Sequence, residues 1–215
     1  MGMDITMHEP PTAAEVREAG LDADAPDYYR FNVSGMHVMV LAMVAAGVVS
    51  DRDPVPEFPV WPPNGAAKDR EDALRDAVDD PSLEVRLTSA ERIQLRTAKA
   101  ANAKALASRS KRKGMVPAYK FQSNEGWIVT PPECTAIATR MQAYASRLTQ
   151  KDLTALSVAY AKAQARLLQQ IQRPGETVVY NPTDLGMTVA ELREWVESWA
   201  AYNRIAAKHG GYRVE

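Results

Sequence analysis

The chain has 215 residues, of which 46% are hydrophobic, and this share is sufficient for a globular core. Its 26 basic and 27 acidic side chains nearly cancel, unlike the strongly basic balance of dedicated nucleic-acid-binding domains. Cys134 is the single cysteine, which excludes a disulfide within the chain and a zinc site built from several cysteines, and suits a reducing cytoplasm.

Five Thr-x-x-acid sequences predict where helices begin. In such a capping box the threonine oxygen accepts a hydrogen bond from an amide of the first turn, and the acidic side chain accepts one from the threonine amide. The five pairs are Thr12/Glu15, Thr88/Glu91, Thr130/Glu133, Thr149/Asp152 and Thr188/Glu191.

The first part of the chain is expected to contain one strand and one apolar helix. Residues 1–25 are interpreted as a mobile segment that holds one short helix. Residues 28–33, "YYRFNV", favour a strand because they are rich in aromatic residues. Ser34 is expected to cap a buried helix over residues 36–46, which Gly47 would end.

The middle of the chain alternates proline-rich, charged and polar segments. Residues 51–65 are expected to be an extended connector because they are rich in proline. Residues 84–87 favour a short strand, and the alanine-rich basic segment 90–113 is predicted to be helical and to stop at Gly114. The sequence "YKFQSNEGWIVT", residues 119–130, predicts a β-hairpin that turns at the Asn-Glu-Gly step.

Three amphipathic helices are predicted after the last three capping boxes, because apolar residues recur there at helical spacing. Residues 176–180 and 212–215 favour short strands. Together these elements predict one α+β domain over residues 26–215. It would be predominantly helical, with about five to six helices around a small antiparallel sheet.

Three segments resemble parts of small uncharacterised proteins of bacteria and bacteriophages. They are "RFNVSGM", "KFQSNEGWIVTPPEC" and "WAAYNRIAAKHGGYRVE", which together cover about a third of the chain. The shared features are a hairpin turn, a capped helix start and a glycine helix stop. The resemblance implies a bacterial or phage origin and brings no activity or cofactor with it.

The standard catalytic and metal-binding signatures are absent from the sequence, and we expect no metal site and no cofactor. There is no G-x-S-x-G, H-E-x-x-H, G-x-x-x-x-G-K or G-x-G-x-x-G sequence. Cys134, at a predicted helix start, could act as a nucleophile with His37 or His209 as its base. We favour a buried Cys134, a hydrogen-bonded His37 in the core and a His209 that stabilises a helix end.

The polar turn before Trp127 offers a candidate ligand-binding loop, formed by Asn124, Glu125, Trp127 and His209. The alternative is that these residues serve the backbone angles of the turn and anchor the sheet, and we favour that alternative.

The strongest functional signal is the segregation of charge. Residues 1–89 carry 17 acidic and 7 basic side chains, whereas residues 90–113 carry 8 basic side chains and one acidic side chain. The basic set could contact phosphates, complement the end of a helix, or pair with the acidic segment 68–84. Its members are Arg92, Arg96, Lys99, Lys104, Arg109, Lys111, Arg112 and Lys113.

These observations favour a non-catalytic interaction protein, regulatory or accessory, of bacterial or phage origin. It would be cytoplasmic and would act through its charged segments on a protein partner or on its own copies, without a membrane. The first alternative is a protein that binds nucleic-acid backbones through residues 90–113. The second is an enzyme or small-ligand binder that the sequence does not reveal.

Overall fold

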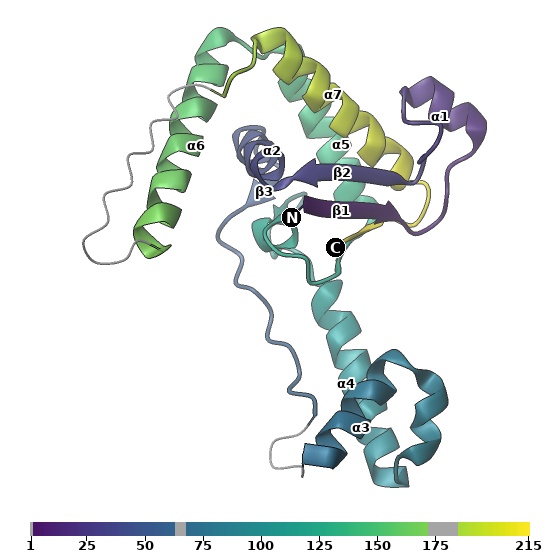
Figure 1. Ribbon diagram of the computed structural model, residues 1–215. Helices are drawn as coiled ribbons and strands as arrows, with labels where there is room; N and C mark the ends of the chain where they lie inside the picture. Colours follow the sequence, from purple (N-terminus) through teal and green to yellow (C-terminus); the bar gives the residue numbers. More distant parts are fainter. Residues whose placement is uncertain (1, 63–67, 172–184) are drawn as a thin grey trace. The chain divides into compact units, whose positions relative to one another are not determined.

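The computed structural model describes residues 2–62, 68–171 and 185–215 and divides the chain into two compact units (Figure 1). Unit 1 comprises Met1–Asp53 and Arg109–Glu215, and unit 2 is the inserted segment Pro54–Ser108. This division differs from the single domain expected over residues 26–215. The fold class is confirmed, because the chain combines helices with a four-stranded antiparallel sheet.

The sheet of unit 1 has the strand order β2-β1-β6-β5, and every neighbouring pair is antiparallel. Its register aligns the buried side chains with one another, as in the pairs Met3 with Phe31 and Val129 with Tyr212. The sheet therefore has one buried face, as alternation along each strand requires. The strands are β1 (Gly2–Met7), β2 (Tyr28–Asn32), β5 (Trp127–Val129) and β6 (Tyr212–Val214).

The N-terminal strand β1 lies between β2 and β6, inside the sheet. It belongs to residues 1–25, which the sequence led us to expect as mobile. Hydrogen bonds between Asp4 and Glu215 extend its pairing with β6. Strand pairing between the two ends of a chain leaves little local signal, which accounts for the difference from the expectation.

Aromatic side chains form the centre of unit 1. Helix α7 (Val189–Ala206) contributes Trp199 and Tyr202, which stack with ring centroids 5.6 Å apart. Both rings also contact Tyr212 of β6, and the Tyr202 hydroxyl donates to the carbonyl oxygen of Asp27. Helix α7 is thus fixed against the sheet by large buried rings, which are strong contributors to core stability.

All five capping boxes predicted from the sequence are present. The apolar helix begins earlier than predicted, however, and its cap is Asn32, whose side chain accepts from the Gly35 amide. Ser34 lies inside this helix, so the prediction of a Ser34 cap is wrong. The remaining helices of unit 1 are α1 (Ala13–Ala19), α2 (Val33–Ala45), α5 (Pro131–Ser146) and α6 (Gln150–Ile171).

Unit 2 is built from two helices and a short 3₁₀ segment. Leu74, Ala77, Leu87 and Leu95 form its buried cluster, against which Trp61 packs. The indole of Trp61 donates to the carbonyl oxygen of Leu74, which fixes the proline-rich stretch to the first helix. The elements are α3 (Lys68–Asp79), η1 (Pro81–Arg86) and α4 (Ser89–Leu106).

Three strand predictions have different outcomes. Residues 84–87 lie in and just after the 3₁₀ helix η1, so the predicted strand there is wrong. The predicted hairpin is also wrong, because Ala118–Phe121 form the 3₁₀ helix η2 and β5 pairs with β6 instead. Residues 176–180 lie outside the described residues.

Gly126 explains why the hairpin signal misled. Its φ of +76° is in the left-handed region that the turn prediction required. A Cβ atom at this position would also lie 2.7 Å from the guanidinium of Arg213 on β6. The glycine conformation is thus as predicted, but the preceding residues form no strand with β5, which pairs with β6 instead.

Candidate functional site

The eight basic residues of the predicted helix belong to two different units. Helix α4 ends at Leu106, so the prediction of one helix over residues 90–113 that stops at Gly114 is wrong. Arg92, Arg96, Lys99 and Lys104 lie on α4 in unit 2. The other four lie in unit 1, in a segment we call the basic loop, residues 109–113.

Charge pairing does occur within unit 2, between the predicted acidic and basic segments. The Lys99 ammonium lies 3.1 Å from a carboxylate oxygen of Glu84 and also donates to the Ala77 carbonyl oxygen. Arg70 donates from Nε to Glu91 over 2.7 Å. Lys99 thus joins α4 to the end of α3 and to η1, while Arg70 joins α3 to the start of α4.

The pair Arg70–Glu91 reverses the expected polarity, because the basic partner comes from the acidic segment. The Arg70 guanidinium and the cap of Thr88 together lower the pKa of Glu91 to about 2. Glu91 therefore serves both as the capping acid of α4 and as the counter-ion of α3. This double role ties the start of α4 to α3 and depends on an ionised carboxylate.

Unit 2 leaves an unusual number of large apolar side chains in solvent. Among the described residues of the whole chain, eight such side chains are exposed, and six of them lie in unit 2, which is about a quarter of the chain. Val85 and Ile93 are 76% and 65% exposed. The six are Val55, Phe58, Val60, Val78, Val85 and Ile93.

A groove of about 400 Å³ lies within the same unit, between α3, α4 and the proline-rich stretch. Its apolar lining comes from Pro59, Trp61, Val78, Leu95 and Ala98, and its polar lining from Arg75, Lys99 and Asn102. Apolar lining mixed with a few charged and polar side chains is typical of surfaces that receive a helix or an extended segment of another protein.

The basic loop has a defined backbone. Ser110 donates from its hydroxyl to Asp53 over 2.7 Å, and the Arg112 amide donates to the Ser110 hydroxyl over 3.0 Å. Strand β4 (Val116–Pro117) follows and pairs in parallel with β3 (Val49–Ser50). The loop is therefore held at both ends by residues 49–53.

A buried ion pair lies in the same region and was not predicted from the sequence. Lys120 is 0% and Glu133 5% exposed, and the ammonium lies 3.0 and 2.9 Å from the two carboxylate oxygens. Lys120 also donates to the Ile128 carbonyl oxygen. Burial lowers the pKa of Lys120, while the charge of Glu133 acts in the opposite direction. All three Lys120 protons thus have acceptors.

Cys134 is buried beside this pair, and burial raises the pKa of its thiol far above the usual value. A thiolate is the reactive form, so this environment opposes the nucleophile hypothesis. Its thiol instead lies 3.7 Å from the Val129 carbonyl oxygen. The Nε2 atom of His209 lies 3.1 Å from Glu15 on α1. His37 differs from its expectation, because its buried Nδ1 has no hydrogen-bond partner among the described residues.

The four residues of the candidate ligand-binding loop lie in different parts of unit 1. Trp127 is buried in β5 opposite Val214, and its indole donates to the Ser123 hydroxyl. Asn124 and Glu125 are exposed on the turn that precedes it. His209 lies instead after α7, beside α1. The ring of Trp127 thus anchors the sheet, as the favoured alternative held.

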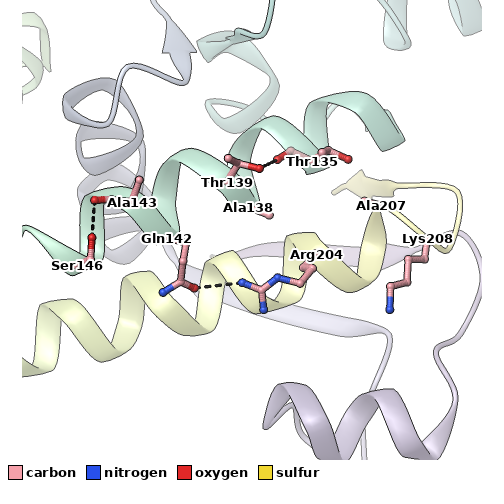
Figure 2. A pocket seen from close by; sticks show the side chains of 9 residues that line it. All are labelled: Thr135, Ala138, Thr139, Gln142, Ala143, Ser146, Arg204, Ala207 and Lys208. Carbon is pink, nitrogen blue, oxygen red and sulfur yellow. Dashed lines mark hydrogen bonds between the residues drawn. The ribbon is translucent and has the colours of Figure 1, made fainter.

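A groove of about 690 Å³ lies between α5 and α7, and Figure 2 shows the side chains that line it. The hydroxyls of Thr135, Thr139 and Ser146 donate to carbonyl oxygens of their own helix. Across the groove, Arg204 donates to the Gln142 side-chain oxygen over 3.1 Å. The groove holds small and hydroxyl side chains together with the cations Arg204 and Lys208, and its lining includes no acid–base pair.

Within the part of the chain that the structure describes, no group of three or more His, Cys, Asp or Glu side chains is arranged to hold a metal ion. Over the same residues, no helix combines the length and apolar character that crossing a membrane requires. No known protein family matches the chain, and comparisons with curated proteins and with solved structures find no significant match.

Proposed function

We propose that the protein is a non-catalytic interaction protein and that unit 2 is its protein-binding part. The observation that carries this proposal is the concentration of exposed large apolar side chains on unit 2, which also holds a groove with a largely apolar lining. Exposed apolar surface on a small unit is costly in water and is typical of surfaces that a partner covers. Its charges, by contrast, are partly used within the unit by Lys99 and Arg70.

The first candidate partner is a second copy of the chain. Unit 2 carries nine acidic and eight basic side chains, so two copies repel each other little. A net charge near zero favours association over solubility, because apolar contacts then act without long-range opposition. The bacterial or phage origin and the cytoplasmic location remain part of the same proposal, and the single buried cysteine is compatible with a reducing compartment.

Sedimentation equilibrium of the purified chain tests the proposal. We expect the wild-type chain to associate with a dissociation constant in the micromolar range. The double variant Val85→Glu/Ile93→Glu should raise this dissociation constant at least about tenfold, because each new charge would be buried at the interface. Val158→Glu is the matched control, since Val158 on α6 is 50% exposed but belongs to unit 1. Circular dichroism checks that every variant is folded.

Two results would contradict the proposal. A wild-type chain that stays monomeric up to about 100 µM would remove self-association, because that limit corresponds to a binding free energy weaker than about −5.5 kcal/mol. If Val158→Glu weakened association as much as the unit 2 variant does, the interface would lie outside unit 2.

A further inference from the structure

The basic loop of unit 1 carries four exposed cations. Among the described residues, no ion pair involves Arg109, Lys111, Arg112 or Lys113. All four residues are exposed. The loop backbone that holds them is fixed by Ser110 and by the pairing of β4 with β3. The positive charge is therefore concentrated on an ordered segment.

Three of these cations border one recess. A hollow of about 200 Å³ is lined by Arg109, Ser110, Arg112, Lys113, Gly114 and Met115 on one side and by Pro132, Glu133 and Ala136 of α5 on the other. Because one water occupies about 30 Å³ of liquid, the hollow has room for a tetrahedral oxyanion and a few waters. Lys111 is not among the lining residues.

The one carboxylate in this lining does not oppose an anion, because it is already neutralised. Both oxygens of Glu133 accept from Lys120, and one of them also accepts from the amide and hydroxyl of Thr130. Asp53, the acid that faces the loop, accepts from Ser110 and interacts with Arg112, so its charge offsets part of the positive charge of the loop. The recess thus keeps an excess of positive charge after its internal pairs are formed.

We propose that this recess binds the phosphate group of a phosphomonoester, with Arg109, Arg112 and Lys113 supplying its positive charge. Arginine forms paired hydrogen bonds with phosphate oxygens, and several cations around one recess favour a dianion over a monoanion. A nucleic-acid backbone presents a row of singly charged diesters, which suits a line of cations better than one recess. The inference is independent of the role proposed for unit 2.

Amide NMR shifts of the full chain test this site at pH 7.5, with inorganic phosphate, a phosphoserine peptide and dimethyl phosphate as separate probes. We expect saturable shifts at residues 109–115 and 133–136 with the two dianions and at least tenfold weaker binding of the diester. If the phosphoserine peptide binds more tightly than inorganic phosphate, the natural ligand is a phosphorylated protein. Equal affinities would identify a small phosphate compound as the ligand. Binding of the peptide should weaken below about pH 6, where its phosphate takes up a proton.

Matched variants separate the recess from the general charge of the loop. Arg109→Gln and Arg112→Gln should each weaken phosphoserine binding at least tenfold, whereas Lys111→Gln removes an equal charge from the same loop and should change it less than threefold. Equal losses in the three variants, or tighter binding of duplex DNA with a steep salt dependence, would replace the recess by a diffuse nucleic-acid contact. No saturable shift at 20 mM phosphate would also overturn the proposal. Unchanged shifts of the Val116 and Val129 amides show that the variants are folded.

Discussion

Unit 1 and unit 2 are stabilised in different ways. Unit 1 buries Trp127, Trp199, Tyr202 and Tyr212 almost completely around one sheet face. Among its described residues, unit 2 buries a small cluster of leucine and alanine side chains and adds two ion pairs between its elements, while six large apolar side chains stay exposed. A small unit buries a smaller share of its surface, so its stability margin is narrow. The comparison indicates that unit 1 is complete by itself, whereas unit 2 presents surface that association can cover.

The largest expected effect is on the core of unit 1. Trp199→Ala removes a ring that contacts Tyr29, Phe31, Tyr202 and Tyr212, and we expect it to lower the free energy of unfolding by about 3–5 kcal/mol. Urea titration measures this loss. The control Val158→Ala should change stability by less than about 0.5 kcal/mol, because that side chain is half exposed. A Trp199 variant as stable as the control would show that the ring cluster does not support unit 1.

A cavity in unit 2 should have a smaller, local effect. Leu95→Ala removes a fully buried side chain from the small cluster, and we expect a loss of about 2–4 kcal/mol. Hydrogen exchange should rise over residues 68–106 and stay unchanged in the strands of unit 1, because unit 1 has its own core. Equally faster hydrogen exchange in both units would mean that they unfold together, and would contradict the view that each unit has its own core.

Acid should weaken the contact between α3 and α4 in unit 2. Arg70 and Thr88 hold the pKa of Glu91 at about 2, below its ordinary value of 4.5. A depressed carboxylate pKa stabilises the folded state above pH 4.5, and this contribution is lost as the pH falls towards 2. Exchange in α3 and α4 should therefore rise across that window, and Glu91→Gln should remove much of the dependence. If hydrogen exchange in Glu91→Gln depended on pH as it does in the wild type, Glu91 would not be the group that titrates.

Local features were predictable from the sequence, and contacts between distant segments were not. All five capping boxes formed, because each depends on residues three apart. For the apolar helix, Asn32 and Ser34 are equally good caps, and the sequence alone does not choose between them. Helix α3 was missed because its charged sequence looked like a counter-ion segment. Its apolar residues Leu74 and Ala77 lie three apart, which is the signal that could have revealed it.

The candidate site shows the same limit. The basic cluster was visible in the sequence, but its division between α4 and a loop of unit 1 was not, since alanine and lysine favour helix up to Gly114. The ion pair between Lys120 and Glu133 was not visible in the sequence either. The capping box already explained Glu133, and Lys120 lies in a segment predicted to be a strand.

Hydrogen exchange of the wild-type chain at low and high protein concentration tests the central claim most directly, because it reads both units in one sample. We predict that protection over residues 54–62 and 68–106 increases with concentration, while protection in β1, β2, β5 and β6 stays constant. Concentration-independent exchange in unit 2, or a concentration-dependent change confined to unit 1, would contradict the claim that unit 2 is the surface that association covers.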